Sequence, residues 1–361
     1  MSNPLLVPPP HQGPPIPYEQ LLEEARAALP STLPDEPDQV MLALDVDGTL
    51  LQPSGASPRV QRTVADALEA GMKVVIATGR GRSSTQPVLE ALGIPAGYSV
   101  SSNGAQTYEW LRKQDYYATL LRQFSFAPDD AARIALDALP DLLLGVDDGE
   151  GGLFVSDFFP PGELMSRQRV LPVDELLSRP TPRLVLRAPG MDRDYFAEIL
   201  DGLPLEDVEY SVGWTAWADV SPLGVSKAAA LEALVDDLGV SKDGTIAIGD
   251  GTNDIEMLQW AAHGVAMGGA TPQVQAAADT VAGPVDYDGA AARRLWRNTD
   301  PVTVLRGVFF RGAAGLEAQD DHTSQNHDDQ DDNHRGGDFR YGIPGGFDDV
   351  RGVAVFTGLH R

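Results

Sequence analysis

The 361-residue chain contains no cysteine. This absence excludes disulfides, thiolate nucleophiles and zinc sites built on thiolates. Basic residues are scarce as well, because 27 Lys and Arg stand against 53 Asp and Glu, which gives a net charge of −26. A nucleic-acid backbone or an anionic membrane surface binds to a basic face, so we expect neither as a partner. The many acids are typical of a well-solvated surface.

Long apolar runs are also missing. No run of about 18 apolar residues occurs, so the sequence predicts no membrane-spanning helix. The start of the chain lacks a basic stretch leading into an apolar one, so we expect no secretory signal and a cytoplasmic location. Hydrophobic residues make up 42% of the chain, enough for a sizeable core. The length predicts two domains, or one domain with a large insertion.

Both ends of the chain have a biased composition. Residues 1–38 are rich in proline, which fixes φ and removes a hydrogen-bond donor, so we expect a flexible arm with a short helix at Tyr18–Leu29. Residues 311–361 form an acidic tail that holds too few apolar residues around Ala318–Asp338 to fold. Its His and Asp residues also allow weak metal binding. Phe347–Phe356 resembles a strand without an evident partner.

Between these ends, strand-like and helix-like segments alternate. Short apolar runs are typical of buried parallel strands, and they occur at Val40–Val46, Lys73–Ala77, Tyr98–Ser102, Thr245–Ile248 and Val265–Met267. Helical spacing is found at Ser57–Ala70, Gly81–Leu92, Lys227–Leu238, Asp254–Ala262, Pro272–Ala278 and Gly289–Arg297. This alternation predicts an α/β fold, with a Rossmann-like parallel sheet built from residues 39–105 and 215–300.

The middle of the chain, residues 106–214, follows a different pattern. Strand signals are found at Tyr116–Leu120, Leu142–Val146, Leu153–Val155 and Arg183–Arg187, and helix signals at Pro128–Leu139 and Asp192–Leu200. We therefore expect an α+β unit inserted into the parallel-sheet core.

Polar residues follow three of the expected parallel strands. They are Asp45 and Asp47 after the first strand, Thr78 and Gly79 after the second, and Asp250, Asn253 and Asp254 after a later one. Ligands of open parallel sheets bind at the carboxyl ends of the strands, so these residues are expected to meet. Carboxylates repel one another unless a cation lies between them, and oxygen ligands without His or Cys favour Mg²⁺.

Lys227 is the fourth element of this pattern. It lies in the first turn of its expected helix, after Ser226 as a possible cap. A cation at the positive end of the helix dipole costs about 0.3–1 kcal/mol, and a phosphate in front of it would reverse that sign. Together these parts suit phosphoryl transfer. Asp45 is placed to attack phosphorus, Asp47 to act as acid and base, and Thr78 and Lys227 to hold phosphate oxygens.

Each cluster also has a plainer interpretation. An Asp after a strand often caps the next helix, Asp-Gly pairs occur in ordinary turns, and Lys227 could point into water. The coincidence of three clusters at strand ends favours the chemical interpretation.

These motifs resemble the haloacid dehalogenase-like superfamily, and within it the Cof-type phosphatases of subclass IIB. The resemblance extends over Asp45–Thr49, Thr78–Arg80, Lys227, Gly249–Asp254, Ser102–Ala105 and Val265–Gly268. It implies the fold of that superfamily with a cap domain over the site. It also implies Asp45 as nucleophile and Asp47 as general acid/base. The implied Mg²⁺ ligands are Asp45, the Asp47 carbonyl and Asp250, with Asp254 as a ligand or close by. Asn253 would orient Lys227 or the phosphate.

Spacing separates the subclasses of this superfamily. Thr78 follows Asp45 by 33 positions. One helix and one strand fill this interval, so the inserted unit must come later in the chain, as it does in subclass IIB. Dehalogenases lack the second carboxylate, which is present here as Asp47. Candidate cap contacts with the substrate are Asp147, Asp148, Glu150, Arg187 and Trp214. Arg80 could touch the substrate or pair within the core.

Three functions remain open at this point. The first is a Mg²⁺-dependent phosphatase of small phosphomonoesters, such as sugar phosphates. The second is a phosphohexomutase that uses the same aspartyl-phosphate chemistry. The third is an interaction protein that binds a phosphorylated ligand. The sequence leaves the oligomeric state open.

Overall fold

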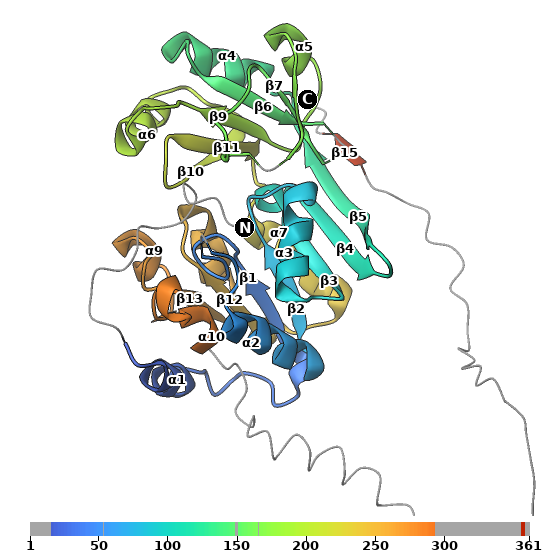
Figure 1. The fold of residues 1–361 in the computed structure, drawn as a ribbon, viewed down its shortest axis with the longest axis vertical. Helices are drawn as coiled ribbons and strands as arrows, with labels where there is room; N and C mark the ends of the chain where they lie inside the picture. Colours follow the sequence, from blue (N-terminus) through green and yellow to red (C-terminus); the bar gives the residue numbers. More distant parts are fainter. Residues whose placement is uncertain (1–15, 53, 149–150, 165, 293–354, 358–361) are drawn as a thin grey trace, which may run out of the picture. The chain divides into compact units, whose positions relative to one another are not determined.

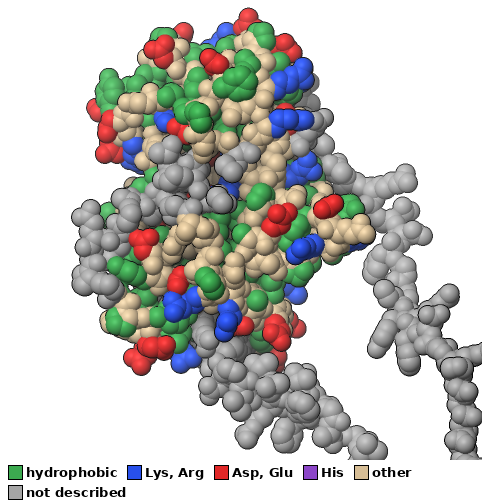
Figure 2. Space-filling model, in the orientation of Figure 1, with side chains coloured by type: hydrophobic (Ala, Val, Ile, Leu, Met, Phe, Trp, Pro, Cys, Tyr) green, Lys and Arg blue, Asp and Glu red, His purple; other side chains and the backbone are tan. Residues whose placement is uncertain are grey.

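The computed structural model describes residues 16–52, 54–148, 151–164, 166–292 and 355–357 (Figure 1). Two sheets organise them, one of nine strands and one of six. No helix among the described residues is long and apolar enough to cross a membrane. On the face drawn in Figure 2, Asp and Glu side chains are interspersed with Lys and Arg.

The nine-stranded sheet has the order β14-β13-β12-β1-β2-β3-β4-β5-β15. Its first six strands run parallel to their neighbours, and β3, β4 and β5 are joined as antiparallel pairs. The bounds are β1 Met41–Leu44, β2 Lys73–Ala77, β3 Ala96–Ser101, β4 Gln106–Arg112, β5 Tyr116–Ser125, β12 Thr245–Gly249, β13 His263–Ala266, β14 Thr280–Val281 and β15 Val355–Thr357. The predicted parallel sheet is confirmed.

Helices cover both faces of this sheet, which explains why its strands lack polar alternation. Met41 and Ala43 of β1 pack with residues of α7 and α8, whereas Leu42 and Leu44 face α2 and α10. The helices of the core are α2 Pro58–Glu69, α3 Arg82–Leu92, α7 Lys227–Leu238, α8 Ile255–Trp260, α9 Pro272–Ala276 and α10 Gly289–Ala292. The part of the last predicted helix after Ala292 lies outside the described residues.

The short helix expected at Tyr18–Leu29 is present as α1, Tyr18–Ala27. Its apolar face buries Leu21, Leu22 and Ala25, and the Tyr18 hydroxyl donates to the Ala291 carbonyl at 2.9 Å. Burial of this apolar face stabilises the helix, although prolines flank it in the sequence. Residues 1–15 and most of the acidic tail lie outside the described residues. Within the tail, β15 pairs with Gln123–Ser125 of β5, the partner that the sequence did not reveal.

The six-stranded sheet has the order β10-β11-β9-β6-β7-β8 and is antiparallel apart from the β7–β8 pair. Its elements are β6 Leu143–Asp147, β7 Leu153–Val155, β8 Gln168–Val170, β9 Leu184–Arg187, β10 Val208–Val212, β11 Trp217–Pro222, α4 Asp129–Ala138, α5 Val173–Leu177 and α6 Arg193–Asp201. Phe196, Leu200 and Leu176 from α6 and α5 pack on the sheet residues Leu144, Leu186 and Val220 in one buried cluster. This arrangement is an α+β unit, as the sequence predicts, and we call it the cap.

The strands of the cap sheet do not coincide with residues 106–214, the bounds expected for the inserted unit. β4 and β5 continue the nine-stranded sheet, and β11, which follows residue 214, belongs to the cap sheet. β4 is fastened to the core by pairing with β3 and by the buried Trp110, whose indole donates to Ser99 Oγ at 2.8 Å. The apolar pattern of a strand does not reveal which sheet will hydrogen-bond to it.

Candidate active site

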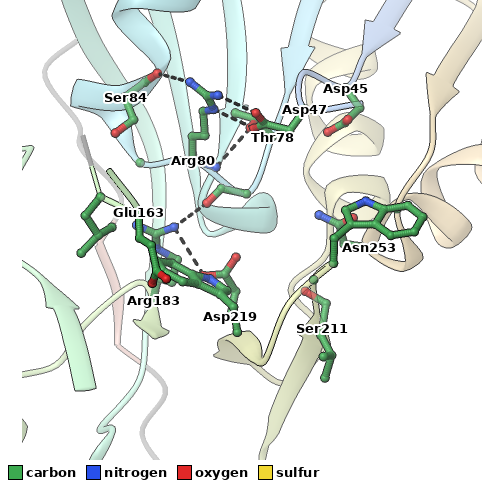
Figure 3. Close-up of a pocket in the computed structure, with 18 of the residues that line it drawn as sticks. Asp45, Asp47, Thr78, Arg80, Ser84, Glu163, Arg183, Ser211, Asp219 and Asn253 are labelled. Carbon is green, nitrogen blue, oxygen red and sulfur yellow. Dashed lines mark hydrogen bonds and ion pairs between the residues drawn. The ribbon is translucent and has the colours of Figure 1, made fainter. Parts of the chain in front are cut away.

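The loops after β1, β2 and β12 bring the predicted residues to one edge of the sheet. Asp45 follows β1, and its amide donates to the Ile248 carbonyl at 3.0 Å, which ties this loop to β12. One carboxylate oxygen from each of Asp45, Asp250 and Asp254 lies within 4.8 Å of the others. All three side chains are buried. Figure 3 shows Asp45, Asp47, Thr78 and Asn253 at the same pocket.

Lys227 lies inside this carboxylate cluster. Its Nζ donates to Asp45 Oδ1 and to Asp254 Oδ1, each at 2.7 Å, and its side chain is fully buried. The interpretation that Lys227 points into water is therefore wrong. The carboxylates offset the unfavourable position of this cation in the first turn of α7. Despite burial, their attraction raises the pKa of Lys227, so it carries a positive charge at neutral pH.

A glycine of the Ser102–Ala105 motif allows α7 to bring Lys227 to the site. Gly104 has φ of +104°, a conformation that favours glycine, and a Cβ built there would lie 2.1 Å from the Ser226 carbonyl oxygen. Ser226 caps α7, since its hydroxyl accepts a hydrogen bond from the Ala229 amide at 3.3 Å. The motif is thus needed for backbone packing directly beside Lys227.

Asp254 and Asn253 hold other parts of the site together. Asp254 accepts Lys227 on Oδ1, and on Oδ2 it accepts the amides of Asp250 at 3.0 Å and of Gly251 at 2.9 Å. Asn253 Nδ2 donates to Asn103 Oδ1 at 2.9 Å. Asp254 therefore positions both Lys227 and the loop that carries Asp250, whereas Asn253 contacts the motif after β3.

The carboxylate cluster has the properties of a cation site. Asp250 accepts from the Thr49 hydroxyl on Oδ1 at 3.0 Å, but its buried Oδ2 has no hydrogen-bond partner among the described residues. Burial, and then repulsion from Asp254, raises the pKa of Asp45 to about 7, although Lys227 opposes the shift. Burial and repulsion from Asp45 also raise the pKa of Asp250. A divalent cation with oxygen ligands fits this excess of buried negative charge and the unpartnered oxygen.

Asp47 is held apart from this cluster by Arg80. The guanidinium donates to Asp47 from Nε at 2.7 Å and from Nη2 at 2.5 Å, a bidentate pair that is almost buried. Arg80 also donates to the Ser84 carbonyl at 3.3 Å, and its amide donates to Thr78 Oγ1 at 3.1 Å. The sequence left open whether Arg80 touches the substrate or pairs within the core, and in the structure it pairs with Asp47.

A cavity of about 290 Å³ lies over these residues, and the cap forms its other wall. Asp147 and Trp214, two of the expected cap contacts, line it. Arg187 is not among its lining residues, because it forms a bidentate pair with Glu163 at 2.7 Å. Asp148 pairs with Arg167 at 2.9 Å, away from the cavity lining, and Glu150 lies outside the described residues.

The sequence patterns did not point to Arg183, a polar residue that contacts the core. Arg183, which directly precedes β9, donates through Nη1 to the Gly79 carbonyl at 2.7 Å, and this Nη1 lies 3.4 Å from Asp219 Oδ1 (Figure 3). Asp219 also accepts from Trp217 Nε1 at 3.2 Å and from Asn103 Nδ2 at 3.4 Å. The available signal was an acid inside the apolar strand around Trp217–Pro222, since a buried charge needs a partner.

Comparison with known proteins agrees with this geometry. The family model described as haloacid dehalogenase-like hydrolase matches residues 42–128 and 169–292. The chain belongs to the haloacid dehalogenase-like hydrolase family. Within this family it is a phosphoric monoester hydrolase of the Cof type, as its motifs imply.

Named relatives of this family span most of the described chain. The pyridoxal phosphate phosphatase YbhA of Escherichia coli is 30% identical over 275 residues, which is 70% of this chain and 96% of the relative. An HMP-PP phosphatase of Serratia proteamaculans is 32% identical over 248 residues, covering 65% and 86%. A solved subclass IIB sugar phosphatase shares the fold with a TM-score of 0.58 at 23% identity, covering 70% of this chain and 96% of its own.

Proposed function

We propose that the protein is a Mg²⁺-dependent phosphatase of small phosphomonoesters that works through an aspartyl-phosphate on Asp45. The observation that carries this proposal is the buried contact of Asp45 with Lys227, beside the Asp250 oxygen that has no hydrogen-bond partner in the described part of the chain. In this arrangement the proposed nucleophile contacts a cation, and an oxygen that would bind the metal lies nearby, where β1 and β12 end. The named relatives act on small phosphorylated metabolites, which supports the same class of substrate here.

Two in-line displacements account for the reaction. In the first, an Asp45 oxygen bonds to phosphorus while the bond from phosphorus to the leaving oxygen breaks, and Asp47 gives its proton to that oxygen. In the second, water attacks phosphorus and passes a proton to Asp47, and the bond to Asp45 breaks to release phosphate. The bidentate contact with Arg80 holds the Asp47 carboxyl group in place for both proton transfers.

The remaining site residues hold the phosphoryl group and the metal. Thr78, the Gly79 backbone, Asn253 and Lys227 would bind phosphate oxygens, where negative charge gathers. Asp45, the Asp47 carbonyl and Asp250 would hold Mg²⁺. The Asp254 oxygens already accept hydrogen bonds from Lys227 and from two backbone amides, so Asp254 would position these ligands. The metal supplies positive charge that shields the nucleophile from the phosphate.

Phosphate release from a panel of phosphomonoesters tests the proposal. We expect release with Mg²⁺, no release with EDTA, and a loss of more than about 10³-fold in Asp45→Asn. Urea unfolding in EDTA serves as the control. Asp45→Asn removes one of three buried carboxylates, so this variant should unfold at the same or a higher urea concentration.

Two outcomes would contradict the proposal. One is unchanged turnover by Asp45→Asn. The other is isomerised sugar phosphate without free phosphate, which would indicate the phosphohexomutase instead. Absence of turnover in folded protein would favour the third function, binding of a phosphorylated ligand. A cytoplasmic location stays a prediction from the sequence.

A further inference from the structure

The strand β15 belongs to the core sheet, although it comes from the far end of the chain. Residues 293–354 separate it from α10 in the sequence, and the match to the family model ends at residue 292. Its residues 355–357 pair in parallel with Gln123–Ser125 of β5. β15 is therefore a strand of this sheet that the family model does not include.

The outer edge of β5, the edge that faces away from β4, is the place where β15 docks. In the sheet order, β4 lies on one side of β5 and β15 on the other. The register between β4 and β5 shifts between Thr107 and Tyr108, so the end of β5 follows a β-bulge, which bends a strand locally. A free strand edge presents backbone donors and acceptors that an extended segment can pair with.

The residues of β5 that pair with β15 directly precede the crossing into the cap. β5 ends at Ser125, and the next residue, Phe126, already pairs with a residue of the cap. The Phe126 amide donates to the Thr181 carbonyl at 3.0 Å, and the Thr181 amide donates to the Phe126 carbonyl at 2.9 Å. Phe126 also packs against the buried cluster of the cap. A restraint on the end of β5 therefore acts where the cap begins.

The other edge of the same strand end contacts the motif beside Lys227. The Phe124 amide donates to the Ala105 carbonyl at 2.9 Å. Ala105 follows Gly104, the residue that packs closely on the Ser226 carbonyl at the start of α7. β15 thus docks on a strand end that contacts both the cap and the loop that supports α7.

We propose that the outer edge of β5 over Gln123–Ser125 is a strand-docking site for residues 355–357 of the same chain, and that the docked strand restrains the cap at its crossing from the core. Covalent attachment makes the docking intramolecular, which raises the effective concentration of this short segment. Movement of a cap controls access to the cavity beneath it, so the docked strand limits how readily the cavity opens.

Hydrogen exchange of backbone amides in two shortened chains tests the proposal. One chain ends at Thr357 and keeps β15, and the other ends at Ala354 and loses it. In the chain without β15 we expect the amides of Phe126 and Thr181 to exchange about tenfold faster or more, whereas the chain that keeps β15 retains the rates of the full chain. The amides of Lys73–Ala77 in β2 should exchange equally in both. Equal exchange at Phe126 and Thr181 in the two chains would overturn the proposal.

Proline variants of the full chain test whether backbone pairing is responsible. Val355→Pro combined with Phe356→Pro removes two amides of β15, and proline cannot donate to a neighbouring strand. Gly358→Pro combined with Leu359→Pro is the matched control, because both positions follow β15. We expect the first pair to speed exchange at Phe126 about tenfold and the second to leave it unchanged. Exchange as slow in the first pair as in the second would overturn the pairing.

Dilution distinguishes docking within one chain from docking on a second copy. For docking within the chain, the exchange rates at Phe126 and Thr181 should stay the same over about a hundredfold dilution. Exchange that becomes faster on dilution would overturn docking within the chain and indicate a second copy as the source of the strand. None of these measurements uses turnover, so their outcome is independent of whether the proposed phosphatase function holds.

Discussion

The two walls of the cavity hold their charges in different ways. On the core wall, three buried carboxylates share one buried lysine, so negative charge is left over. In the cap, the buried Arg183 and Arg187 each pair with a carboxylate of their own, Asp219 and Glu163. Burying unbalanced charge is costly, and the core keeps it where a metal and a phosphate would bind. The cap balances each of these buried cations inside its own fold.

Buried carboxylates and cations thus serve different purposes in the core and in the cap. In the core, the charges form a site that a ligand would complete. In the cap, these pairs satisfy one another within the fold. Removal of the one cation of the core cluster should therefore reduce activity and stability together, and the following predictions compare the two regions in order of decreasing effect.

Lys227→Met should have the largest effect. It leaves three buried carboxylates without their cation, so we expect the free energy of unfolding to fall by about 3–5 kcal/mol and phosphate release to be lost. Urea unfolding with and without Mg²⁺ measures the first effect. Lys242→Met is the control, because Lys242 pairs with Glu232 at the surface and contributes about 1 kcal/mol or less. Equal losses in the two variants would contradict the special role of burial in the core.

Gly104→Ala should have an intermediate effect, because it pushes the start of α7 away from the motif after β3. We expect about a 10²-fold loss of kcat, the size that a displacement of about 1 Å can cause. Gly93→Ala is the matched control. Gly93 also has positive φ, +69°, but a Cβ there meets nothing within 4 Å. The control should lose about 1 kcal/mol of stability and keep its activity. Unchanged kcat in Gly104→Ala would show that Lys227 does not depend on this contact.

Removal of helix caps should have the smallest effect and the same size in both regions. Ser57 caps α2 of the core by accepting the Val60 amide at 3.1 Å, and Asp192 caps α6 of the cap by accepting the Asp194 and Tyr195 amides at 3.0 Å. Ser57→Ala and Asp192→Ala should each lower the free energy of unfolding by about 1 kcal/mol, measured in urea. A much larger loss in one of them would mean that the two regions also differ in local structure.

Local sequence patterns were enough to predict several strands and the grouping of the carboxylates. Apolar runs such as Lys73–Ala77 predict buried strands because both faces of a parallel sheet are covered, and β2 has these bounds. The residues after β1 and β12 could be grouped because the carboxyl ends of parallel strands share one edge. For this reason Asp45, Asp250 and Asp254 were expected together, and the structure brings their oxygens together.

The partners of residues far apart in the chain became evident from the folded structure. The sequence does not reveal that β4 and β5 join the core sheet, or that β11 joins the cap, because strand pairing joins residues far apart in the chain. It also does not reveal that Arg80 holds Asp47, that Asn253 contacts Asn103, or that Arg183 reaches Gly79. These contacts depend on how two sheets pack around one cavity, and a charge that is buried there takes the partner that packing puts within reach.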